Sequence, residues 1–177
     1  PMTAAMAVAL GDTGWLRTQH AQGTLENTIL DSGGILSIAV RLDRPEILEL
    51  LLDLGLDPNE RIPHSQGMPL WHCAGSGKHR MARLLLERGA DPNASVYASG
   101  DPVFQAYAVR DQQMIDLLAS FGGIPAASTA GLYRLTALGR KFLAGEAPCR
   151  LERAHGLAEE LLWGAACGGD PELTRLA

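Results

Sequence analysis

Residues 67–93 read GMPLWHCAGSGKHRMARLLLERGADPN, and the rest of the chain varies this stretch. Pro69 suits the first turn of a helix, where its missing N–H has no intrahelical partner. After a Gly-Ser-Gly break, the apolar residues take the i, i+3, i+4 spacing of an amphipathic helix: Met81, Leu84 and Leu85. Gly89 suits a helix C-terminus because it readily adopts a left-handed conformation. The stretch therefore predicts a short helix, a tight turn, a longer helix and an extended loop.

The same closing signal recurs along the chain at nearly constant intervals. Leucine-rich segments within 47–52, 84–86 and 114–118 each precede a glycine and turn-forming residues. The closing glycines are 32, 34 and 33 residues apart: Gly23, Gly55, Gly89 and Gly122. Such even spacing indicates a repeat architecture, in which each unit buries its apolar face on its neighbours.

Residues 67–93 resemble an ankyrin repeat. The ankyrin pattern places T-P-L-H-x-A in the first helix and ends the second helix with L-L-L-x-x-G-A-D-x-N. Met68 and Trp71 replace the threonine and histidine, whereas residues 84–86 and 89–93 match closely. The resemblance is to divergent repeats of the bacterial type. It implies an all-α solenoid of helix-turn-helix units joined by extended finger loops.

The repeat divides the chain into predicted units within a single solenoid spanning residues 1–177. These units are 3–33, 34–66, 67–99, 100–125, an irregular helical unit 126–160 and an incomplete repeat 161–177. The period fails in 126–160, where apolar residues from Leu132 to Leu143 predict one helix. Because the last repeat is incomplete and residue 1 is proline, we expect a segment of a longer repeat protein.

Composition narrows the class of protein. The hydrophobic fraction is 46% with only 5% aromatic residues, which fits a helical stack built from leucine and alanine. A net charge of −5 without a basic patch argues against nucleic acid as a partner. No apolar run reaches the roughly 18 residues of a membrane span. The three cysteines are scattered along the chain, which suits reduced thiols: Cys73, Cys149 and Cys167. We therefore predict a soluble cytoplasmic protein.

No catalytic, cofactor-binding or metal-binding constellation is predicted. Residues 74–79, AGSGKH, have only part of a phosphate-binding loop pattern and are interpreted as an inter-helix turn. The spacing of His72, Cys73 and His79 does not fit a zinc site, and packing roles explain them, with His72 at a position that is usually buried. An enzyme in the irregular segment would have to use His155 with Glu159 or Glu160, which a solvated helix face explains more simply.

The remaining candidate site is a surface for a protein partner. In the ankyrin family, the finger tips and the exposed ends of the first helices line a concave groove that binds partners. By resemblance, the matching positions are Leu10, Arg41, Leu42, His64, Ser65, Gln66, Ser76, Tyr97, Ala98 and Val109. Three apolar residues recur at one repeat position: Leu10, Leu42 and Val109. They form either an apolar stripe along the groove or contacts between repeats.

The predicted function is a non-enzymatic protein-interaction module. We expect Tyr97 and His64, on neighbouring fingers, to lie side by side and to contribute to partner binding. The alternative is a regulatory or targeting segment of a longer protein whose activity lies outside residues 1–177.

Overall fold

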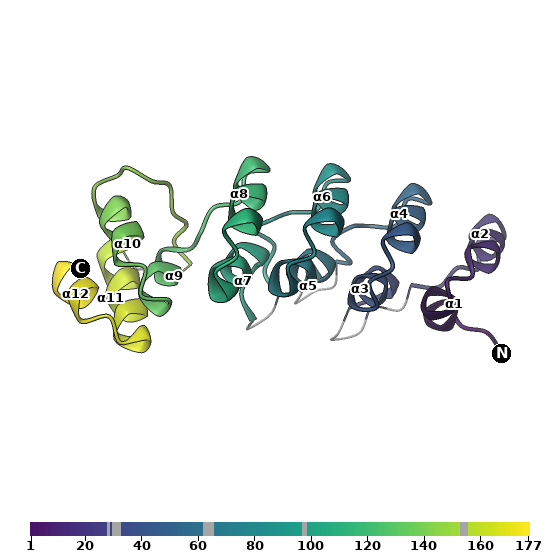
Figure 1. Ribbon diagram of the computed structural model, residues 1–177, viewed down its shortest axis with the longest axis horizontal. Coiled ribbons are helices and arrows are strands. Elements are labelled where there is room, and N and C mark those ends of the chain that lie inside the picture. Colours follow the sequence, from purple (N-terminus) through teal and green to yellow (C-terminus); the bar gives the residue numbers. More distant parts are fainter. Residues whose placement is uncertain (28, 30–32, 62–65, 97–98, 153–155) are drawn as a thin grey trace.

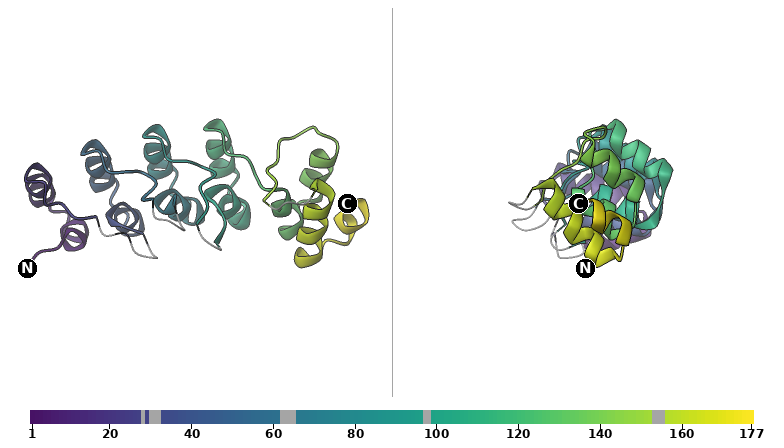
Figure 2. Two further views of the ribbon diagram at one scale, coloured as in Figure 1. Left: turned by 180° about the vertical axis from the view of Figure 1, so that it is seen from behind. Right: turned by 90° about the vertical axis from the view of Figure 1, so that its left-hand side faces the viewer.

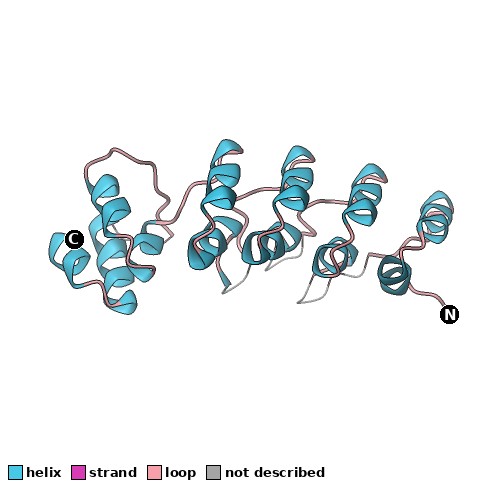
Figure 3. Ribbon diagram, in the orientation of Figure 1, coloured by secondary structure: helices cyan, strands magenta, loops and turns pink. Residues whose placement is uncertain are grey.

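The described part of the chain is a row of paired α-helices. In a computed structural model, the described residues are 1–27, 29, 33–61, 66–96, 99–152 and 156–177, and they form twelve α-helices. The pairs follow one another along the long axis of the molecule, from the N-terminus to the C-terminus (Figure 1). Within these described ranges there are helices and loops but no strand (Figure 3). The predicted all-α solenoid is confirmed.

Each pair consists of a first helix and a second helix. The first helices are α1 (Ala4–Leu10), α3 (Ile35–Arg41), α5 (Met68–Ser76), α7 (Pro102–Val109), α9 (Ala127–Leu132) and α11 (Leu157–Gly168). The second helices are α2 (Thr13–Ala21), α4 (Pro45–Asp53), α6 (His79–Glu87), α8 (Gln112–Ser120), α10 (Thr136–Leu143) and α12 (Pro171–Leu176). In the first four pairs the first helices form one layer and the second helices another (Figures 1 and 2).

A left-handed residue separates the two helices of every described pair. Its φ lies between 55° and 75° in all six turns: Gly11, Asp43, Gly77, Arg110, Arg134 and Gly169. The conformation reverses the chain within a few residues, and glycine adopts it at least cost. Three turns use a larger residue, so a search for glycine alone misses half of them.

Two helices lie within residues 127–143, and the prediction of one helix from Leu132 to Leu143 is wrong. Helix α9 ends at Leu132 and α10 begins at Thr136, with Arg134 in the left-handed conformation between them. The connection from α8 to α9 is only the six residues 121–126, whereas the connection from α6 to α7 is residues 88–101. The 33-residue period fails here because the connection before this helix pair is shorter than a finger loop.

Asparagine side chains join consecutive units at the end of the second helices. Asn59 accepts a hydrogen bond from the Asp91 N–H at 2.8 Å and donates to the Gly89 carbonyl at 3.3 Å. Asn93 repeats the arrangement one unit later, accepting from the Ile124 N–H at 2.9 Å. An amide carries both a donor and an acceptor, so one side chain satisfies both backbone groups. The recurring Asp-Pro-Asn turn therefore serves to connect neighbouring units.

A buried carboxylate caps helix α3 from the following finger. Glu60 is 1% exposed and accepts hydrogen bonds from the N–H groups of Gly34 at 2.7 Å and Leu36 at 2.8 Å. The hydroxyl of Ser37 donates to the same carboxylate at 2.6 Å. The first N–H groups of a helix have no intrahelical acceptor, and a negative charge there also interacts favourably with the helix dipole.

The hydrophobic core of the described residues has two parts. The larger runs from Ala7 to Leu118 and includes Leu85, which is fully buried as predicted. The smaller runs from Ala127 to Leu173 and is built on Phe142 and Leu161.

Helices α9 and α11 bring the smaller core together through direct backbone contact. A Cβ atom added at Gly131 would lie 2.1 Å from the backbone nitrogen of Ala165. A Cβ added at Gly164 would lie 2.4 Å from the backbone oxygen of Ser128. Both distances are far shorter than any real contact, so only glycine allows this approach.

The two parts of the core meet through a ring contact of Phe104 with Tyr133, whose centroids are 5.1 Å apart, and through polar contacts of Arg150. Arg150 pairs with the buried carboxylate of Asp101 and donates from Nε to the Ile124 carbonyl at 2.8 Å. Its own carbonyl accepts from the Ala127 N–H at 2.8 Å. Burial raises the pKa of Asp101, and this effect exceeds the opposing effects of the Phe104 N–H and Arg150. One side chain from a distant loop thus connects the fourth and fifth units.

Candidate functional site

The exposed ends of the first helices form a row that we call the inter-helix edge: Leu10, Leu42, Ser76 and Val109. Each of these residues immediately precedes the left-handed residue of its turn. Leu10 is 69% exposed, and Leu42 and Val109 are each 48% exposed. All three side chains are therefore accessible to a partner, although Leu42 and Val109 are also about half covered by the protein.

In the first five units the first helices carry almost no charge, whereas α11 of the sixth unit carries Glu159 and Glu160. Helices α1, α3, α5, α7 and α9 are described throughout, and Arg41 is their only arginine, lysine, aspartate or glutamate. Carboxylates lie instead on the second helices, as Glu46, Glu49 and Asp53 do on α4. The chain is acidic overall, but this layer is apolar with one cation.

Arg41 lines a shallow hollow on the first-helix layer. The hollow has a volume of about 390 Å³ and is lined by Arg41, Trp71, His72, Gly75, Ser76, Lys78 and Gln105. The finger that follows the third unit fixes one wall, because Trp71 Nε1 and Gln105 Nε2 each donate to the Ser99 carbonyl at 3.2 Å. Trp71 thus offers a half-buried indole in a fixed orientation.

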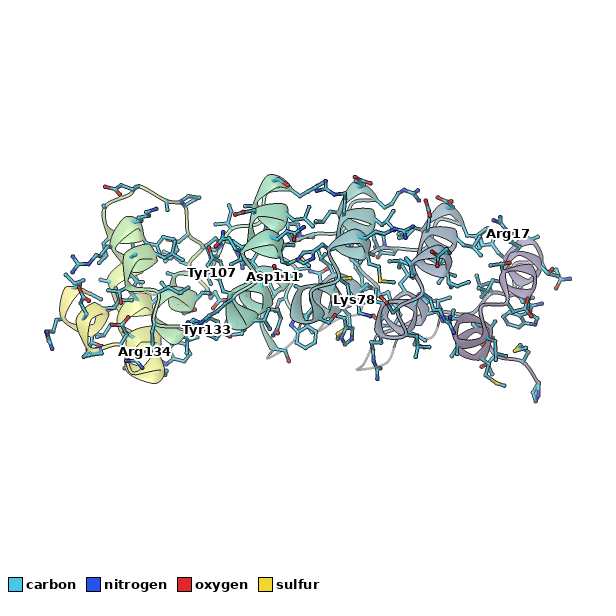
Figure 4. All side chains as sticks on the ribbon, viewed as in Figure 1. Arg17, Lys78, Tyr107, Asp111, Tyr133 and Arg134 are labelled. Carbon is cyan, nitrogen blue, oxygen red and sulfur yellow. The ribbon has the colours of Figure 1, made fainter. Side chains whose placement is uncertain are left out.

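Lys78 has a structural role at the other wall of this hollow. Its ammonium group donates to the Val40 carbonyl at 2.8 Å and pairs with Asp43 at 3.1 Å. Figure 4 shows Lys78 on the side of its unit that faces the second unit. Among the described residues, by contrast, the exposed guanidinium of Arg41 has no hydrogen-bond or ion-pair partner.

The finger positions of the predicted site are only partly described. Gln66 is exposed, and its N–H donates to the Ser95 carbonyl at 3.1 Å. His64, Ser65, Tyr97 and Ala98 lie outside the described residues, so their predicted proximity stays a prediction.

The residue types that prompted a search for chemistry have structural roles. Burial raises the pKa of the Cys73 thiol far above its ordinary value, and nearby Lys78 offsets only part of this effect. His79, the first residue of α6, has its Nε2 atom 2.8 Å from Asp111 Oδ2, whereas Cys73 is a buried residue of α5. Asp111 in turn caps α8 by accepting from the Met114 N–H at 3.0 Å.

The remaining chemical candidates lie at the start of α11, where Glu160 is only 2% exposed, so the expected solvated helix face is wrong for this residue. Glu159 accepts from the Gly156 N–H at 3.2 Å at the start of α11, and His155 lies outside the described residues. In the described ranges, no three His, Cys, Asp or Glu side chains gather as metal ligands would. Among the same residues, no helix has the length and hydrophobicity to cross a bilayer.

Five residues of the hollow were not among the predicted site residues: Trp71, His72, Gly75, Lys78 and Gln105. His72 was expected at a buried position but is half-buried, and its ring lies edge-on to Trp71 with centroids 5.2 Å apart. The sequence signal for Trp71 was that a tryptophan replaces the usual histidine of the repeat pattern. Gln105 had none, because only the fold brings α7 beside α5.

Comparison with known proteins agrees with this geometry. The ankyrin-repeat family matches residues 67–95. Over 95 residues the chain is 36% identical to the ADP-ribosylation factor GTPase-activating protein AGD4 of Arabidopsis thaliana, covering 51% of this chain and 12% of that protein. Over 88 residues it is 33% identical to the potassium channel KOR2 of Oryza sativa subsp. japonica, covering 50% of this chain and 12% of that protein. Both relatives are plant proteins and lend no support to the expected bacterial type.

Solved structures resemble nearly the whole chain. The ankyrin repeat domain of Bcl-3 superposes with a TM-score of 0.69 at 17% identity, covering 99% of this chain and 86% of that one. The human ASB11 ankyrin repeat domain gives a TM-score of 0.58 at 20% identity, covering 96% and 83%. These likenesses establish the fold, and the fold of this chain is that of an ankyrin-repeat domain.

Proposed function

We propose that this chain is a non-enzymatic module that holds a protein partner on its first-helix layer and fingers. Ankyrin-repeat domains are generally interaction modules, and repeat solenoids bind through extended concave surfaces. The observation that carries the proposal is the exposed apolar row of Leu10, Leu42 and Val109 beside the hollow at Trp71. Exposed apolar patches tend to mark protein interfaces.

A capture experiment with matched variants tests this proposal. Wild-type protein and the double variant Leu42→Asp/Val109→Asp are immobilised and exposed to a lysate of the source organism, and bound proteins are quantified. We expect captured partners to fall by about tenfold or more, as for the loss of an interface anchor. Leu143→Asp is the control, because Leu143 is 38% exposed at the end of a second helix. Equal capture by both variants would refute the site.

A second candidate function comes from the proportions of the relatives. The chain matches only 12% of the length of each plant protein. We propose as the alternative that the repeats are a regulatory or targeting segment of a longer protein. Deleting residues 1–177 from the full gene product would then change its activity or its location.

The proposed setting is the cytoplasm, and the proposed partner is neither nucleic acid nor membrane. The cysteines are all free, including the exposed Cys167, which suits a reducing compartment. The overall net charge of −5 disfavours a phosphate-rich partner.

A further inference from the structure

Charged groups are distributed unevenly along the inter-helix edge. Exposed arginines flank two of its apolar residues in the sequence, as Arg41 precedes Leu42 and Arg110 follows Val109. Within the described residues, neither guanidinium has a hydrogen-bond or ion-pair partner. Each end of this stretch therefore combines an exposed apolar side chain with an unpaired cation.

The carboxylates of the same edge are already occupied. Asp12 accepts from the Trp15 N–H at 2.9 Å, and Asp111 accepts from the Met114 N–H and contacts His79. Asp43 pairs with Lys78. Because these negative charges are engaged at helix N-termini or in an ion pair, no carboxylate of the described residues neutralises Arg41 or Arg110.

We propose that the partner segment held on this edge is acidic and apolar: carboxylates face Arg41 and Arg110, and apolar side chains cover Leu42, Val109 and the Trp71 hollow. This inference rests on the proposed function and specifies its partner class. Complementary charges give specificity and faster association, while buried apolar contacts contribute most of the affinity.

A protein segment fits these observations better than nucleic acid or lipid. A nucleic-acid backbone requires many closely placed cations and gains nothing from exposed leucine and valine side chains. A bilayer surface selects amphipathic helices with several basic residues, whereas α3 and α7 together contain one arginine and no lysine. On the inter-helix edge, the uncharged Ser76 of the third unit lies between the two arginine positions, which matches a chain with spaced carboxylates.

Fluorescence anisotropy with defined peptides tests the partner class. The probe is a labelled peptide in which glutamate alternates with leucine. In one comparison peptide lysine replaces glutamate, and in another serine replaces leucine. We expect the glutamate–leucine peptide to bind tightest and to bind less well as salt increases.

Arginine variants test the residues. Arg41→Gln and Arg110→Gln should each weaken binding of this peptide by about two- to fivefold, the range for an exposed ion pair. Arg17→Gln is the matched control, since Arg17 is an exposed arginine on α2 at the N-terminal end of the row (Figure 4). It should leave the affinity unchanged.

Several outcomes would overturn the inference. Equal binding of the lysine–leucine peptide, or unchanged binding by Arg41→Gln/Arg110→Gln, would exclude an acidic partner segment. Arginine-dependent binding of phosphatidylserine vesicles or single-stranded DNA without peptide binding would assign the surface to phosphate groups. If Leu42→Asp/Val109→Asp loses captured protein while the arginine variants retain it, the proposed function stands and the acidic class is wrong.

Discussion

At the residue scale, Glu60 shows how a charge is accommodated inside the row. A buried carboxylate is costly unless hydrogen bonds replace its water shell. Glu60 obtains them from the first N–H groups of α3 and from the Ser37 hydroxyl. In the sequence it is only the first residue of an extended finger, so its burial could not be predicted without the contact between units.

Replacing Glu60 by glutamine should destabilise the protein. The amide presents an NH₂ group to N–H donors, so at least one helix donor loses its acceptor. We expect Glu60→Gln to lower the free energy of unfolding by about 1–3 kcal/mol, measured by urea denaturation. Glu87→Gln, at an exposed position on α6, should change it by no more than about 0.5 kcal/mol. Equal effects from both variants would contradict the capping role.

At the element scale, α9 and α11 pack without side chains between them at Gly131 and Gly164. Gly164→Ala would place a methyl group against the Ser128 carbonyl, and forcing extra volume into a packed contact costs about 1–3 kcal/mol. Gly14→Ala is the control, because its nearest neighbour would be 3.6 Å away and alanine favours a helix over glycine. Thermal melts should move in opposite directions for the two variants, and a stabilised Gly164→Ala would contradict the close approach.

Some elements could be predicted from the sequence, and others could not. The Asp-Pro-Asn turns and leucine spacing located α3 to α8. The break between α9 and α10 was missed because Arg134, not glycine, takes the left-handed conformation. Arg110 already shows that substitution in the preceding unit.

The candidate site was predictable only where it follows the repeat register. Leu10, Leu42 and Val109 follow from counting positions, and their exposure agrees with the predicted stripe. The hollow at Trp71 is lined by side chains from three units, including Arg41 from the second and Gln105 from the fourth. The periodicity of a single unit does not indicate which side chains of neighbouring units line the same hollow.

At the scale of the whole molecule, the row consists of two apolar cores, which are connected by Arg150 and by the ring contact of Phe104 with Tyr133. Arg150→Ala would leave the Asp101 carboxylate buried without its partner, so we expect a loss of about 1.5–3 kcal/mol. The two cores should then unfold in separate steps, because neighbouring units stabilise each other only through their interfaces. Hydrogen exchange of residues 1–120 and 127–177 would reveal the separation. Arg175→Ala, at an exposed position of α12, should leave one concerted transition.

The asparagine links also give the chain a direction during synthesis. The side chain of Asn59 can accept its hydrogen bond only after Asp91, 32 residues later in the chain, has been synthesised. At ribosomal rates of about 5–20 residues per second, that interval lasts about 2–6 s. The leading unit of a growing chain thus leaves the ribosome with its asparagine amide still without its backbone partners, and each new unit completes the one before it. We expect chains truncated just before Asp91 and released from the ribosome to be cleaved by protease near Asn59, and released chains extended past Ile124 to resist there.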